Sequence, residues 1–325
     1  MQGTVALFST PEADREHYDK CVRVLDRVFE PNEMSGPFIP GFGWPHITDE
    51  NVSAEATAWT LLALTKALSV PGLASASERE RLLLRLDQVQ TALDNYRSKD
   101  KQSGRPNGGW TLFAQQDDPG HANVYITLLV CQGLLDLSQA DLPWHQSREL
   151  RDSLLDAALA WLLQHFDGRG WSTPSTVADQ FNDGFTFQVF GTLLLAEAAG
   201  RVKLPDAILS QIPILLGECG TWPLDHKSPV ALFSSPYRNH LGKATLHPQR
   251  LMRPVWYAWA VNCAACWLRR CERTSAQRDE IVRTRRVLGH LLLTLGPKAI
   301  QEGGAGGYTY VTAETLIGLS AIDPP

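Results

Sequence analysis

A glycine followed by an aromatic residue recurs along the chain, and this recurrence limits the fold more than any other feature. The copies are Gly43-Trp44, Gly109-Trp110, Gly170-Trp171 and Gly307-Tyr308, with a looser copy at Gly220-Thr221-Trp222. Recurrence at intervals of tens of residues is the signature of a repeat protein, in which one supersecondary unit is stacked several times. We therefore interpret the chain as a stack of similar units.

Most copies are followed by a polar loop and then by an apolar segment whose middle carries almost no charge. These segments are residues 53–68, 122–137, 183–198, 253–268 and 309–322. A helix that is apolar around its whole circumference is typical of a protein interior. We predict that each segment forms a helix buried on nearly all sides.

A second kind of segment alternates with the first, charged on one face and rich in leucine on the other. Examples are residues 77–93, 147–166 and 275–295. Because an inner layer is covered by an outer layer that faces water, the alternation predicts an all-α protein, an α/α toroid or α/α barrel of about five to six helical hairpins. We expect one domain over residues 1–325, with a helix around residues 12–29 as a candidate sixth element.

The composition excludes several classes of protein. The net charge is -5, with both signs scattered, so we expect no nucleic-acid partner. No apolar stretch reaches about 18 residues and the first residues lack the features of a signal peptide, which predicts a cytoplasmic protein without an integral membrane segment. Most of the six cysteines lie within apolar helical segments, so we expect reduced thiols.

Residues 161–171 read WLLQHFDGRGW, an apolar helix end followed by Gln164, Asp167-Gly168 and Gly170-Trp171. This segment resembles the QW repeat of squalene and oxidosqualene cyclases, and a weaker copy, QSGRPNGGW, lies at residues 102–110. The wider pattern, which spans nearly the whole chain, resembles the superfamily of terpenoid cyclases and protein prenyltransferases. The resemblance implies an α/α toroid whose central aromatic cavity binds an isoprenoid, with cyclisation started by an acid.

The same motif has a structural interpretation that needs no family. Glycine allows a positive φ beyond the end of a helix, the glutamine amide can cap exposed backbone groups, and the indole can stack over the turn. We therefore expect the Gly-Trp pairs to stabilise the repeats.

The class II terpene cyclases of this superfamily protonate their substrate with a DxDD motif. The nearest string here is QQDD at residues 115–118, and a second acidic pair lies in ADQFNDGF. A carboxylic acid in an apolar cavity can stay protonated and donate its proton, because desolvation raises its pKa. The candidate catalytic acids are Asp117, Asp118, Asp179 and Asp183. The alternative is that the first two are solvated loop residues and that Asp183 caps the following helix.

The protein prenyltransferases bind zinc through an aspartate, a cysteine two residues later and a distant histidine. The segment NDGFTFQVFGTLLL resembles theirs with Asp183 in place, but Phe185 stands where the cysteine ligand would be. Cys263 and Cys266 have no second pair nearby in the sequence, and we interpret them as core thiols. We predict no metal site and no cofactor; a diphosphate substrate would allow a role for Mg²⁺.

Residues close to the beginnings of the uncharged helices are the natural ligand contacts, because in such a ring these helix ends open onto one mouth of the cavity. Aromatic rings there can hold a polyprene and stabilise carbocations, and arginine can hold a diphosphate or carboxylate. The alternatives are core packing and a solvated loop within the irregular stretch 219–252. The candidate substrate-binding residues are His121, Trp59, Tyr125, Phe185, Phe187, Arg250, Arg253, Trp256, Tyr257, Tyr308 and Tyr310.

Two classes of function remain open. The first is a terpenoid-cyclase-like protein that binds or cyclises an isoprenoid, or another hydrophobic small molecule, by acid-initiated chemistry. The second is a non-catalytic α/α toroid that binds or scaffolds a peptide, lipid or protein partner. The resemblance favours the first class, and the incomplete DxDD motif and missing zinc ligand favour the second.

Overall fold

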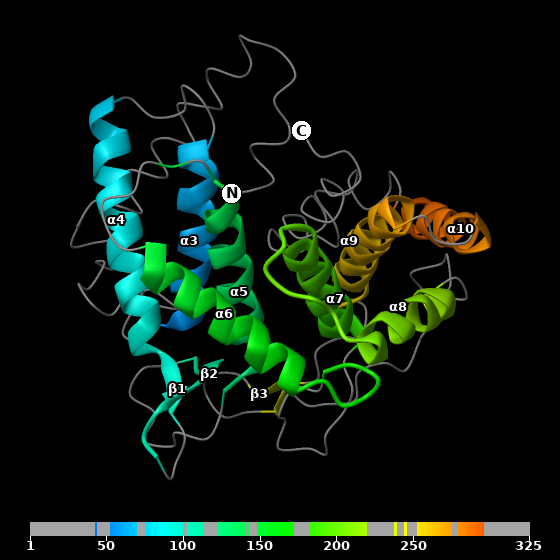
Figure 1. Cartoon of the computed structure of the whole chain (residues 1–325), viewed down its shortest axis with the longest axis horizontal. Coiled ribbons are helices and arrows are strands. Elements are labelled where there is room, and N and C mark those ends of the chain that lie inside the picture. Colours follow the sequence, from blue (N-terminus) through cyan, green and yellow to red (C-terminus); the bar gives the residue numbers. More distant parts are fainter. Residues whose placement is uncertain are drawn as a thin grey trace. The chain divides into compact units, whose positions relative to one another are not determined.

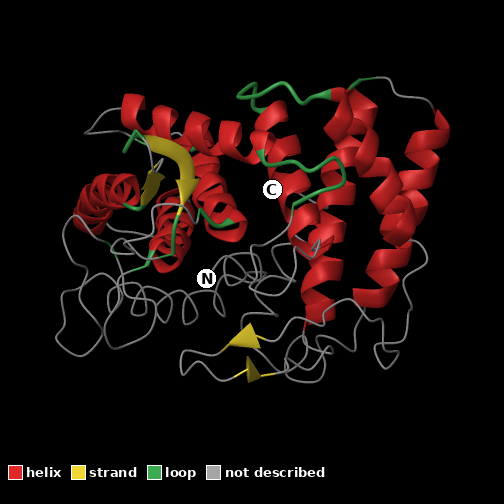
Figure 2. Cartoon of the chain, turned by 90° about the horizontal axis from the view of Figure 1, so that it is seen from below, coloured by secondary structure: helices red, strands yellow, loops and turns green. Residues whose placement is uncertain are grey.

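The computed structural model describes residues 43, 53–69, 76–99, 103–112, 122–140, 142, 148–171, 183–219, 237–238, 244–245, 252–274 and 278–295. Within these ranges the chain forms eight α-helices and four short strands (Figure 1). Helix predominates, as predicted, and Figure 2 shows the same by colour. By its internal contacts the chain divides into two units, Met1–His165 and Phe166–Pro325, and each is described by itself.

The first unit contains two helical hairpins. Helix α3 (Ala54–Ser69) is followed by α4 (Ala76–Asn95), and α5 (Val124–Gln139) is followed by α6 (Arg148–Gln164). The guanidinium of Arg79 in α4 donates to the carbonyl of Leu68 in α3 over 2.7 Å, which joins the end of one helix to the beginning of the next. Helix α3 packs against α5, while α4 packs against α3 and α6 packs against α5.

Helices α3 and α5 begin at the same end of this unit. The N–H of Ala54 donates to the carbonyl of Leu112 over 2.9 Å, and the N–H of Asn123 donates to the carbonyl of Trp110 over 2.8 Å. One short segment is therefore bonded to the beginnings of both helices. The two uncharged helices of this unit, α3 and α5, therefore run parallel. Each is followed by a helix, α4 or α6, that is charged on one face.

Burial in the first unit follows the predicted alternation. Most of α5 is buried, including every residue from Ile126 to Cys131, and the charged helix α6 is buried only at intervals of three and four. The buried positions of α6 are Arg151, Leu154, Leu155, Ala158, Leu159, Trp161 and Leu162. The uncharged segments thus form the interior of the unit and the charged ones its cover.

Strands were not predicted from the sequence. Strands β1 (Arg97–Lys99) and β2 (Pro106–Trp110) form an antiparallel hairpin with an irregular register between α4 and α5. Strands β3 (Tyr237–Arg238) and β4 (Ala244–Thr245) form a second antiparallel pair. Strand β2 contains the Gly-Trp pair of the weaker copy of the repeat motif. Gly109 and Trp110 therefore end a strand instead of following a helix directly.

The second unit repeats the arrangement. It contains α7 (Asp183–Ala198), α8 (Asp206–Cys219), α9 (Met252–Arg273) and α10 (Arg278–Leu295). Helix α8, which holds Pro213 in its interior, has no counterpart among the predicted segments. Residues 186–194 of α7 are all buried, as are residues 258–261 and 263–267 of α9. In α8 and α10 buried and exposed positions alternate at helical spacing.

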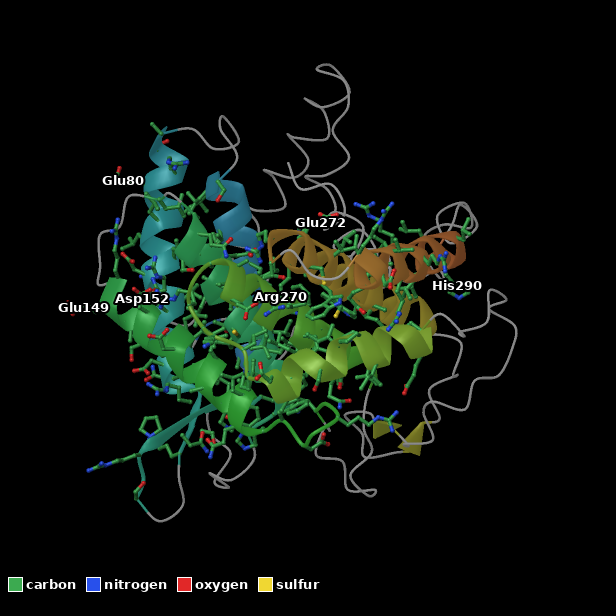
Figure 3. The ribbon with its side chains drawn as sticks, turned by 45° about the vertical axis from the view of Figure 1, so that its right-hand side comes forward. Glu80, Glu149, Asp152, Arg270, Glu272 and His290 are labelled. Carbon is green, nitrogen blue, oxygen red and sulfur yellow. The ribbon has the colours of Figure 1, made fainter. Side chains whose placement is uncertain are left out.

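Two contacts fix the relative direction of α7 and α9. A Cβ placed on Gly191 would meet the side chain of Asn262, and farther along both helices Glu197 forms a 2.6 Å ion pair with Arg270. Both contacts advance along the two helices in the same sense, so α7 and α9 are parallel. The 2.8 Å ion pair between Glu272 and Arg285 joins the end of α9 to α10, which packs against it; Figure 3 labels Arg270 and Glu272.

Other predictions of the fold lie outside the described residues. These are the helices expected over 12–29 and 309–322, and the copies of the landmark at 220–222 and 307–308. No helix among the described residues combines the length and apolar character needed to cross a bilayer.

Candidate functional site

The Gly-Trp pair of the first unit holds three elements together. The Trp110 side chain is fully buried, and its indole N–H donates to the carbonyl of Leu93 in α4 over 2.7 Å. Its backbone N–H donates to the hydroxyl of Thr127 in α5 over 3.0 Å. The guanidinium of Arg97 lies over the same ring, 6.0 Å from its centroid. We call the Trp110 backbone N–H and the Thr127 hydroxyl the first Trp–Thr clasp.

Glycine is required beside this clasp because α6 approaches the backbone closely. Gly108 has φ +90°, and a Cβ there would lie 2.7 Å from the carbonyl oxygen of Ala157. A Cβ at Gly109 would overlap Ala122 and lie 2.7 Å from the indole ring of Trp161. The glycine of the landmark therefore lets β2 lie directly against α6.

The second unit contains an equivalent clasp. The Trp171 side chain is fully buried, and its backbone N–H donates to the hydroxyl of Thr186 over 3.1 Å. The indole packs edge-on against Phe190, with ring centroids 5.3 Å apart, and against Phe166 at 5.2 Å. We call the Trp171 N–H and the Thr186 hydroxyl the second Trp–Thr clasp.

The turn before the second clasp corrects one detail of the sequence interpretation. A carboxylate oxygen of Asp167 accepts hydrogen bonds from the N–H groups of Arg169 and Gly170, at 2.9 and 2.8 Å, and Gly168 has φ +95°. Gln164 is exposed, and within the described ranges its amide has no hydrogen-bond partner. The prediction that the glutamine caps the backbone is wrong; the aspartate does so, because its shorter side chain reaches N–H groups two and three residues later.

The glycine of a third landmark, Gly43, also lies against a threonine. A Cβ at this glycine, which has φ +95°, would overlap the hydroxyl of Thr57 in α3. Thr57, Thr127 and Thr186 are each the fourth residue of an uncharged helix, and all three are fully buried. A threonine at this position was therefore a repeat signal that the sequence interpretation missed.

The beginnings of α3 and α5 form the candidate site of the first unit. The side chain of Asn123 accepts hydrogen bonds from the N–H groups of Tyr125 and Ile126, at 2.8 and 3.4 Å, and the hydroxyl of Ser53 accepts from the N–H of Ala56 at 3.1 Å. These caps satisfy N–H groups in the first turns of α3 and α5. Tyr125 and Trp59 are half-buried on α5 and α3.

Aromatic residues also gather at the beginnings of α7 and α9. Phe185 is half-buried, whereas Phe187 is 1% exposed and packs into the core. When the parallel register of Gly191 with Asn262 and of Glu197 with Arg270 is followed back along both helices, the turn of Phe185 comes level with the turn that carries Trp256 and Tyr257. Three aromatic residues thus occupy neighbouring backbone positions at one end of this helix pair.

The remaining candidates are placed only in part. Asp183 is the first residue of α7, and Arg253, Trp256 and Tyr257 lie in the first turns of α9, with their side chains outside the described part. The other candidates fall wholly outside the described residues and stay predictions: Asp117, Asp118, His121, Asp179, Arg250, Tyr308 and Tyr310.

The described cysteines are free and buried, as predicted. Burial raises the pKa of the Cys131 thiol to about 12, and it raises the pKa of Cys263 well above the usual range, with the charge of Cys266 adding to the effect. A guanidinium nitrogen of Arg269 lies 3.3 Å from the sulfur of Cys266. Neutral buried thiols are poor nucleophiles and poor metal ligands. Within the described ranges no three potential metal ligands come together.

No protein-family model matches the chain, and no curated protein matches it. Because no family is shown by these comparisons, the likeness to terpenoid cyclases and prenyltransferases stands as a prediction from the two motif copies.

Proposed function

We propose that the chain is an α/α toroid of the terpenoid-cyclase type and that it binds an isoprenoid, or a similar apolar ligand, at the end of its second unit where α7 and α9 begin. The observation that carries the proposal is the aromatic group at the beginnings of α7 and α9. Phe185 is left half-buried there, at the level of Trp256 and Tyr257, while the residues that follow it in α7 are buried.

The helix arrangement supports the toroid. In each unit two uncharged helices run parallel and one-sided helices cover them. Repetition of parallel inner helices and returning outer helices is the way an α/α ring or arc is built. The three equivalent threonines, which sit at the same position of α3, α5 and α7, indicate that these helices belong to one repeat series.

The chemistry of the helix ends supports an apolar ligand with a polarisable or charged group. Aromatic faces attract cations and pack well against branched hydrocarbon chains. The beginnings of helices also carry partial positive charge, which favours an anionic group such as a diphosphate. An aspartic acid near such an end, kept protonated by an apolar surrounding, would start a cyclisation by proton transfer; our candidates for this role are Asp117, Asp118, Asp179 and Asp183.

Binding is tested by titrating tryptophan fluorescence with geranyl, farnesyl and geranylgeranyl diphosphates, and with farnesol as a probe without a charge. We expect Phe185→Ala and Trp256→Ala to weaken binding about tenfold or more, because each removes an aromatic contact worth roughly 1.5–3 kcal/mol. The matched control is Leu84→Ala on α4, whose side chain is 57% exposed. The proposal fails if none of the probes binds, or if the two aromatic variants bind as tightly as the control.

Catalysis is tested separately by product analysis after incubation with the same diphosphates. Loss of product in an Asp→Asn variant, with binding retained, would identify the acid among the four candidates. Turnover unaffected by Asp118→Asn and Asp183→Asn would eliminate those two residues as acids.

A second function, that of a non-catalytic binding or scaffolding toroid, is favoured by the full burial of Trp110 and Trp171. The landmark tryptophans serve packing, so the repeats can persist without any enzymatic role. Binding of a prenyl chain without any product would support this second function over catalysis.

A further inference from the structure

We propose that the outer helices α8 and α10 form a self-complementary surface through which two copies of the chain associate. Large apolar side chains are rarely left exposed in groups on a monomer. Of the five such side chains among the described residues, three lie on these two helices: Ile214 at 52%, Val282 at 38% and Leu293 at 78%. Helices α8 and α10 pack against each other and both contact α9, so they form one layer.

The exposed residues of α10 form a stripe along the helix. Val282 and Leu293 are separated by eleven residues, which brings them to nearly the same side after three turns of about 3.6 residues. Arg278, Arg285 and Arg286 border this stripe and are all exposed; Arg285 also forms the ion pair with Glu272, and Asp279 is exposed on the same border. A Cβ placed on Gly289, which lies between the two apolar residues, would meet nothing within 4 Å. The stripe is therefore open, with apolar residues at its two ends and more cations than acids at its sides.

The exposed side of α8 has the opposite charge. Helix α8 contains two acids, Asp206 and Glu218, and no cation, whereas α10 contains four arginines against two acids, Asp279 and Glu280. Ile214 lies between the two acids of α8. A guanidinium nitrogen of Arg169 lies 3.7 Å from a carboxylate oxygen of Glu218, and both side chains are more than half exposed. Such a pair contributes little to stability, and the two acids of α8 outnumber this one cation.

A second copy is the occupant that fits both faces at once. In a two-fold arrangement α8 of one copy meets α10 of the other, so the acidic and cationic faces pair twice and the apolar residues of both helices are covered twice. The helices are 14 and 18 residues long, and at about 1.5 Å per residue and 10 Å in width they present a layer of roughly 500 Å². This is below the standard area for a tight complex, and we expect a dimer of micromolar affinity.

The apolar contribution is tested by sedimentation of the full 325-residue chain over a range of concentrations. We expect a species of twice the 36.0 kDa chain mass at high concentration. Leu293→Asp should raise the dissociation constant about a hundredfold, because two copies of the side chain leave the interface. Leu84→Asp, at an exposed leucine of α4, should leave it unchanged. A wild-type chain that stays monomeric at about 100 μM, or a Leu293→Asp variant that associates like the wild type, would overturn the proposal.

The pairing of α8 with α10 is tested by a charge exchange between copies. One variant carries Arg278→Glu and Arg286→Glu, and the other carries Asp206→Lys and Glu218→Lys. Each variant alone should be monomeric, because it brings like charges together. Their mixture should form a heterodimer, because each reversed helix then meets a complementary one. Circular dichroism confirms that both variants are folded, and failure of the folded mixture to associate would refute this pairing.

Discussion

Replacing Thr127 with valine isolates the contribution of the first Trp–Thr clasp. Valine has the shape of threonine but offers no acceptor, so the backbone N–H of Trp110 loses its 3.0 Å partner in a place from which water is excluded. A buried N–H without a partner costs about 1–3 kcal/mol. We expect Thr127→Val to lower the free energy of unfolding by that amount, measured by urea titration.

Thr65→Val in α3 is the matched control. Thr65 is also buried, but its hydroxyl donates over 2.9 Å to the carbonyl of Leu61 in the same helix, and that carbonyl is within the helical hydrogen-bond ladder. Removal of this donor leaves no backbone N–H unpaired, so the change should stay within about 0.5 kcal/mol of the wild type.

The second clasp gives an independent measurement of the free energy that is lost when a buried tryptophan N–H loses its acceptor. Thr186→Val removes the 3.1 Å acceptor of the Trp171 N–H, and it should cost about as much as Thr127→Val. Because the two clasps share no residues, the double variant should lose the sum of the two within about 0.5 kcal/mol. If Thr127→Val and Thr186→Val are no more destabilising than Thr65→Val, the clasps contribute nothing and the argument for them is refuted.

Two glycine substitutions, one double-mutant cycle and one pH dependence test the units further. Gly109→Ala should lower the free energy of unfolding by about 1–3 kcal/mol, because its Cβ would overlap Ala122. Gly168→Ala should lower it by about 1–2 kcal/mol, because the space is open but φ is +95°. Both are measured by urea titration. A double-mutant cycle of Glu197→Gln and Arg270→Gln should give a coupling of roughly 1 kcal/mol, because both side chains are about four-fifths buried; a coupling of zero would contradict this. Since burial raises the pKa of Cys131 from 9.0 to about 12, the thiol stays neutral in the folded chain while it ionises in the unfolded one, so its contribution to stability should be constant below pH 9 and fall above it by up to about 1.4 kcal/mol per pH unit; Cys131→Ala should reduce the slope of the wild type by this amount, and the other buried thiols should keep their own share.

The helices were predictable from the sequence because burial on all sides and burial on one side leave different residue patterns. The segment expected over 183–198 forms α7 with the same bounds, and the segment expected over 53–68 forms α3 with bounds displaced by one residue. Helix α8 was not among the predicted segments, although Ile208, Ile212, Leu215 and Leu216 give it an apolar side; the interior Pro213 weakens the helical pattern there.

The details of the landmarks could not be predicted in the same way. The strands β1 and β2 are three and five residues long, and the run PNGGW shows no alternation that would indicate a strand. The choice of Asp167 over Gln164 for the turn depends on backbone geometry that sequence spacing does not show. The candidate acids rest on the family resemblance alone, because one sequence carries no record of which aspartates share a cavity.

The clasps have a consequence for how a chain of this kind can lengthen or shorten. Trp110 bonds to residues no more than 17 positions away, and Trp171 to one 15 positions away. The hydrogen bonds of each clasp thus join a helix to segments close to it in the sequence. Insertion or deletion of a whole hairpin would therefore leave the hydrogen bonds of the other clasps intact, so that growth by duplication is open to this architecture at little energetic cost.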